Sequence, residues 1–92
     1  MSEILITPLQ EHHYGVQVDE GHVQTSHEVV VNPQLLDDLG LLDVDEVDVV
    51  RSSVEFLLEQ EPATSILPSF RLEDIAHHFE GYYDDLRSRL AS

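Results

Sequence analysis

Residues 14–31, which read YGVQVDEGHVQTSHEVVV, decide the fold of the first third of the chain. Apolar and polar side chains alternate on both sides of Gly21, and this alternation is typical of strands with one buried face. Gly21 can adopt the positive φ angle of a tight turn, so the stretch predicts a long antiparallel hairpin. We expect Val18 to face Val23 across it. One face of the sheet is then apolar and covered, and the other is polar.

The residues after the hairpin predict three helices. Asn32 is a good N-cap, Pro33 suits the first helical position and Gly40 suits the C-terminal stop, so the first helix covers residues 33–39. Apolar residues at helical spacing predict a second helix, which starts after an aspartate cap at 43 or 45 and ends at Pro62.

A third helix is predicted over residues 72–90, after a loop at 63–68, and Gly81 is a position where this helix can bend. The chain is therefore expected to form one small α+β domain over residues 1–92. An N-terminal antiparallel β-ribbon or hairpin sheet occupies residues 1–31, and a helical part follows over residues 32–92.

The charge of the chain is strongly negative. It has 19 Asp and Glu residues against four Arg and no Lys, a net charge of −15. Salt screens the resulting self-repulsion, so the composition is typical of an acidic, halophilic-type protein. Nucleic acid and anionic membranes are disfavoured partners, because both are bound through Lys and Arg. The chain has no Cys, no long apolar run and no basic start, so we expect a cytoplasmic protein.

The second predicted helix is apolar on two sides. Val47 and Val50 begin one stripe, and Val49 and Phe56 form another. One small sheet and two short helices do not easily cover both, which predicts a homodimer. We expect the dimer interface to consist of Val29, Val31, Val49, Val50, Val54, Phe56 and Leu57.

Residues 27–60 resemble a ribbon-helix-helix module. HEVVV at 27–31 is similar to the ribbon strand of that family, NPQLLDDLG at 32–40 to its first helix, and VVRSSVEFLL at 49–58 to its second. The resemblance implies an intertwined dimer whose paired strands enter the major groove of DNA. Glu28 on the strand and the acidic turn before the second helix repel phosphate, so DNA binding ranks second.

The segment EPATSILP at 61–68, with the apolar residues that follow it, is similar to part of small uncharacterised proteins of haloarchaea and high-GC bacteria. This second resemblance implies a habitat and no activity.

The histidines are the candidate ligand residues. A metal site would combine His12 or His13 with His77 or His78 and a nearby carboxylate, because zinc accepts imidazole and carboxylate ligands. Neighbouring histidines diverge on a helix, so exposed polar histidines are the simpler interpretation. His27 lies on the apolar strand face and is expected to be a hydrogen-bonded core or interface residue.

The sequence contains no nucleophile elbow, phosphate loop or dinucleotide fingerprint. We therefore expect no catalysis and no cofactor. The favoured function is a homodimeric interaction or regulatory module, whose partners are a second copy and another protein. The alternatives are a DNA-binding transcription regulator of the ribbon-helix-helix type and a histidine-based binder of a metal or small ligand.

Overall fold

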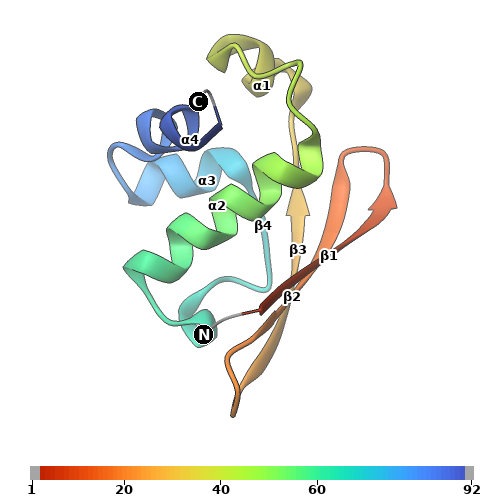
Figure 1. Cartoon of the computed structure of the whole chain (residues 1–92), viewed down its shortest axis with the longest axis vertical. Coiled ribbons are helices and arrows are strands. Elements are labelled where there is room, and N and C mark those ends of the chain that lie inside the picture. The colour runs from red at the N-terminus through yellow and green to blue at the C-terminus, as the bar shows by residue number, and fades with distance from the viewer. Residues whose placement is uncertain (1–2, 91–92) are drawn as a thin grey trace.

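The predicted hairpin forms the two central strands of a four-stranded sheet in the computed structural model, which describes residues 3–90 (Figure 1). The strands are β1 (Glu3–Gln10), β2 (His13–Asp19), β3 (Gln24–Val30) and β4 (Ser69–Arg71), in the order β1-β2-β3-β4. Both pairings along β1-β2-β3 are antiparallel, but β4 runs parallel to β3. The prediction of a purely antiparallel sheet was therefore wrong. Residues 1–2 and 91–92, the ends of the predicted domain, lie outside the described residues.

The hairpin register differs from the predicted one by two residues. Val18 pairs with Thr25 rather than with Val23. The centre of the turn lies one residue later in the sequence than predicted. The side chain of Asp19 accepts a hydrogen bond from the Gly21 amide, and Gly21 adopts a φ of 91°, which together hold the turn in this position. Since side chains alternate with a period of two, this shift leaves the predicted inner face unchanged.

All helices lie on one side of the sheet (Figure 1). Between them and the strands lies one apolar core, which includes Val16, Val18 and Val29 from the sheet. The other face of the sheet carries Leu5, Gln17 and Ser26 in one exposed row, and the Leu9 side chain lies over Gly15 beside it.

The first two helices follow the prediction. In α1 (Pro33–Leu39), the Asn32 side chain accepts from the Gln34 amide, and Gly40 closes the helix with a φ of 73°. In α2 (Glu46–Gln60), Asp45 is the N-cap and accepts from the Val47 amide. Local capping chemistry alone sets these ends.

The third predicted helix is two helices, α3 (Leu72–His78) and α4 (Tyr82–Leu90). Gly81 has a φ of 82°, which ends one axis and starts another instead of bending a continuous helix. The predicted loop at 63–68 contains a short 3₁₀ helix, η1 (Ala63–Ser65). Three helices were therefore the wrong number, because the described residues form four α-helices.

Both apolar stripes of α2 are covered within one chain. The sheet covers one stripe, and α4 packs against α2 and covers the other. The Phe56 ring contacts Phe79 edge-on, with 5.9 Å between ring centroids, and its centroid lies 5.3 Å from that of Tyr82. No helix among residues 3–90 is long and apolar enough to span a membrane.

Candidate functional site

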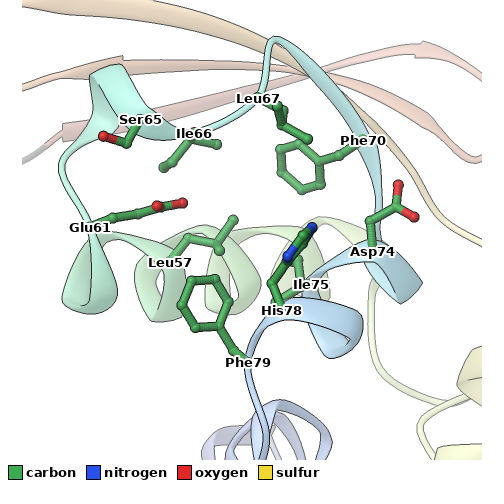
Figure 2. Close-up of a pocket in the computed structure, with 10 residues that line it drawn as sticks. All are labelled: Leu57, Glu61, Ser65, Ile66, Leu67, Phe70, Asp74, Ile75, His78 and Phe79. Atoms are coloured by element: carbon green, nitrogen blue, oxygen red, sulfur yellow. The ribbon is translucent and has the colours of Figure 1, made fainter.

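A pocket of about 400 Å³ lies between the end of α2, the segment that joins η1 to β4, and α3 (Figure 2). This volume is within the range of small-molecule sites. Its walls are mostly apolar, and polar groups occur around its mouth. The lining residues are Leu57, Glu61, Ser65, Ile66, Leu67, Phe70, Asp74, Ile75, His78 and Phe79.

The β3–β4 pairing holds one wall of the pocket in place. Phe70 of β4 is the partner of Val29 in β3, and the Glu28 amide donates to the Pro68 carbonyl at 2.8 Å. These bonds fix the strand that carries Phe70, whose side chain is buried. The position of this wall therefore depends on a contact between segments that are distant in the sequence.

His27 holds the neighbouring part of the same wall. Its Nδ1 lies 2.8 Å from the Leu67 carbonyl, and its Nε2 lies 2.8 Å from the Thr25 hydroxyl. A carbonyl only accepts, so Nδ1 carries a proton and donates to Leu67, and Nε2 pairs with the Thr25 hydroxyl. The prediction that His27 is a hydrogen-bonded core residue is confirmed.

Asp74 fixes the start of α3 on the other side of the pocket. Its Oδ2 accepts a hydrogen bond of 3.0 Å from the Arg71 amide, and its Oδ1 lies 3.6 Å from the Arg71 guanidinium. The backbone hydrogen bond is the main cause that lowers the pKa of this carboxyl, with the nearby positive charge adding to it. Asp74 is therefore ionised at neutral pH.

Two further polar groups point into the pocket. Glu61 extends from the end of α2 toward its centre, and the His78 ring rises between Phe79 and Asp74 (Figure 2). Within residues 3–90, no Arg or His is close enough to Glu61 to form an ion pair with it. An apolar pocket with a few convergent polar groups is the usual form of a binding site.

The four histidines considered as metal ligands do not form a cluster. His12 binds Glu46 through Nδ1 at 2.7 Å, and His13 lies 3.5 Å from Glu28. His77 and His78 are both exposed, and His78 lines the pocket whereas His77 does not. In the described part of the chain, no group of three or more His, Asp or Glu side chains is placed to hold a metal ion.

His12 belongs instead to a small network at the turn between β1 and β2. It adopts a positive φ of 63°, and its partner Glu46 also accepts a 2.7 Å hydrogen bond from the Tyr14 hydroxyl. Burial and the Glu46 carboxylate raise the pKa of Tyr14 to about 12. The network joins the turn to Glu46, the first residue of α2.

Each of the four arginines is already engaged by the protein. Arg71 and Arg87 pair with Asp74 and Asp84, and Arg89 binds both Asp85 and Glu59. Arg51 donates to the Ile4 carbonyl at 3.0 Å. These contacts leave little positive charge for phosphate groups.

The strand of the ribbon-helix-helix resemblance lies inside the sheet. Of its residues 27–31, residues 27–30 belong to β3, which pairs with β2 on one side and, at residues 28–30, with β4 on the other. The ribbon of the resemblance would pair this strand with the same strand of a second copy, and such pairing needs a free edge on β3.

The seven residues predicted for the dimer interface are all buried in the core of one chain. Conversely, the sequence analysis did not identify the pocket. A weak signal was available, because Leu67 is an apolar residue in a segment bounded by Pro62 and Pro68. Such a segment is held by tertiary contacts rather than by its own helical or strand pattern.

The chain matches no protein-family model, no curated protein and no solved structure. The two resemblances described for its sequence therefore stay predictions.

Proposed function

We propose that this protein is a non-catalytic interaction or regulatory module, and that the pocket between α2 and α3 is its binding site. The observation that carries the proposal is the composition of the pocket, in which buried Leu57, Phe70 and Ile75 form apolar walls on an otherwise acidic molecule. A concave site with apolar walls and a few polar groups is the usual form of a small-molecule binding pocket.

The polar groups of the pocket favour binding over catalysis. Among the described residues, no hydrogen bond links His78 to Glu61, Asp74 or Ser65, so nothing in the pocket points to a nucleophile activated by a base. Asp74 is occupied by the backbone and side chain of Arg71. These groups are placed to orient a ligand rather than to exchange protons with it.

A titration followed by amide chemical shifts tests this function. The probe is 4-phenylbutan-1-ol, which has a hydrocarbon body and no charge. We expect shifts confined to residues around the pocket, and loss of binding in Leu67→Trp, because Leu67 is 54% exposed at the mouth and a larger ring there fills the space. Leu42→Trp is the matched control, since Leu42 is 58% exposed and does not line the pocket.

Binding of the alcohol to Leu67→Trp with unchanged affinity, or shifts located elsewhere on the molecule, would contradict the proposed site. Thermal unfolding of both variants serves as the check that each substitution preserves the fold.

A homodimer is the second candidate, on a different surface from the one first expected. Leu5 is 61% exposed and Leu9 54% exposed, and Leu9 lies over Gly15 on the open face of the sheet. The neighbouring Gln17 and Ser26 are uncharged, whereas Glu3, Asp19 and Glu28 lie around them on the same face, so two copies can meet here only in salt that screens these carboxylates. We propose a second copy of the chain as the occupant of the exposed apolar part of this face.

We expect light scattering in molar KCl to give the mass of a dimer for the parent protein. The double variant Leu5→Asp/Leu9→Asp is expected to be a folded monomer, because it puts four carboxylates into the symmetric interface. The control Leu42→Asp, which is remote from the sheet face, should remain dimeric. A monomeric parent protein at micromolar concentration would exclude this candidate.

A further inference from the structure

We infer that the pocket binds a small amphipathic organic cation, in which an ammonium group is attached to an aliphatic or aromatic body. This inference rests on the proposed function and specifies the chemical class of the ligand.

The body of such a ligand fits the walls of the pocket. Phe70 and Phe79 lie on opposite sides of it, with Leu57 and Ile75 between them (Figure 2). These side chains offer no hydrogen-bonding groups, so they favour a hydrocarbon chain or a ring. A fully polar ligand would lose its hydration there without replacement.

The charge of the ligand follows from the two carboxylates. Glu61 reaches into the pocket from α2, and Asp74 stands on the opposite rim (Figure 2). Arg71 already offsets part of the charge of Asp74, whereas no described cationic side chain does so for Glu61. Glu61 is therefore the group that an ammonium ion would pair with, at the edge of the apolar walls.

The other charge classes fit less well. An anionic ligand would meet Glu61 and Asp74 with no Arg or Lys in the lining to balance them. A neutral apolar ligand would remove water from the Glu61 carboxylate and give nothing in return. An ammonium group removes both difficulties, and the net charge of −15 attracts cations toward the whole surface.

A matched series of probes tests this inference. We would titrate 4-phenylbutylamine, 4-phenylbutan-1-ol and 4-phenylbutyrate at neutral pH in 0.5 M KCl, which screens the general attraction of the acidic surface. The three probes share a ring and chain and differ in the charge of the end group. We expect the amine to bind about tenfold more tightly than the alcohol, and the carboxylate to bind least.

Glu61→Gln separates the local pairing from the net charge. We expect the amine to lose about tenfold in affinity in this variant, while the affinity for the alcohol does not fall. Glu55→Gln removes the same charge from an exposed position of α2 outside the pocket, and it should bind all three probes like the parent. The Glu61 substitution is compatible with the fold, because the Glu61 amide, not its carboxylate, bonds to Leu57 at the end of α2.

Equal binding of amine and alcohol, or equal losses in Glu61→Gln and Glu55→Gln, would overturn the cation preference and leave the proposed pocket function intact. Binding of none of the probes at the pocket would instead overturn the proposed function itself. A fourth probe, N-acetyl-phenylalanyl-lysine amide, presents the ring and ammonium on a peptide. Tighter binding of this probe than of the amine would overturn the assignment to a free small molecule.

Discussion

The Tyr82 hydroxyl is a buried polar group that is hydrogen-bonded inside the core. It lies 2.6 Å from the Ser53 Oγ, which in turn lies 2.8 Å from the Val49 carbonyl. The carbonyl only accepts, so Ser53 donates to Val49 and Tyr82 donates to Ser53. Burial raises the pKa of Tyr82 well above its usual range, and the phenol therefore keeps its proton. This chain of two bonds joins α4 to α2.

Substitutions of Ser53 and Tyr82 should lower the free energy of unfolding by different amounts. Ser53→Ala leaves the Tyr82 donor buried without a partner, and we expect it to lower the free energy of unfolding by about 1–3 kcal/mol. Tyr82→Phe removes the donor and leaves Ser53 bonded to Val49, so we expect a smaller loss of about 0.5–1.5 kcal/mol. Urea unfolding of the single and double variants measures both. A greater loss in Tyr82→Phe than in Ser53→Ala would contradict this donor order.

Asp74 should make the stability of the protein depend on acid pH. Its pKa is lower in the folded protein than in the unfolded chain, so its ionised form stabilises the fold. This contribution is complete above the unfolded pKa of about 3.9 and disappears as the pH falls through the folded value. We expect Asp74→Ala to cost about 1 kcal/mol at pH 7, as for other helix-cap side chains, and less as the pH drops below about 4.

Asp43→Ala is the matched control for this experiment, because it removes the same charge from an exposed residue that forms no described hydrogen bond. Thermal unfolding across the pH range gives the comparison. A stability difference between Asp74→Ala and the parent that persists unchanged at pH 2 would contradict the role given to the carboxylate.

At the scale of elements, the sequence was most informative where local chemistry sets the structure. The ends of α1 were predicted because Asn32, Pro33 and Gly40 act on their own neighbours. The division between α3 and α4 was not predicted, since Phe79 continues the apolar spacing across the break. In the structure Phe79 packs on Phe56 from outside any helix, which periodicity alone does not distinguish from a helical position.

Strand β4 shows why the pocket was not found in the sequence. Its three residues have no pattern of their own, and they form a strand because Phe70 pairs with Val29. The pocket walls come from segments between Leu57 and Phe79 that meet only through this pairing and through the packing of α3. The same limit applies to the predicted dimer. The two stripes of α2 require a cover, but they do not indicate whether α4 or a second copy supplies it.

At the scale of the whole molecule, the net charge of −15 should make stability depend on salt. Ion pairs such as Arg87 with Asp84 are exposed and few, so the repulsion among carboxylates outweighs the pairs that salt weakens. We expect the melting temperature to rise steeply from dilute buffer to 2 M KCl, over which the Debye length falls from above 10 Å to below about 3 Å.

The same series in NaCl should coincide with the KCl series at equal ionic strength, because screening does not distinguish the two cations. A melting temperature that stays constant across the salt range would exclude the halophilic-type interpretation.

The parallel strand β4 also has a kinetic consequence. It joins β3 only after the chain has passed through α1 and α2, and it is held by few main-chain bonds, among them the bond from the Glu28 amide to Pro68. A short peripheral strand of this kind is the part of a sheet that opens first, without unfolding of the remainder. If β4 opens in this way, Phe70 leaves the pocket wall, so we expect the site to be complete only when the strand is closed. An occupant of the pocket should therefore slow hydrogen exchange at the Glu28 amide, which lies outside the pocket lining and reports on the closed strand.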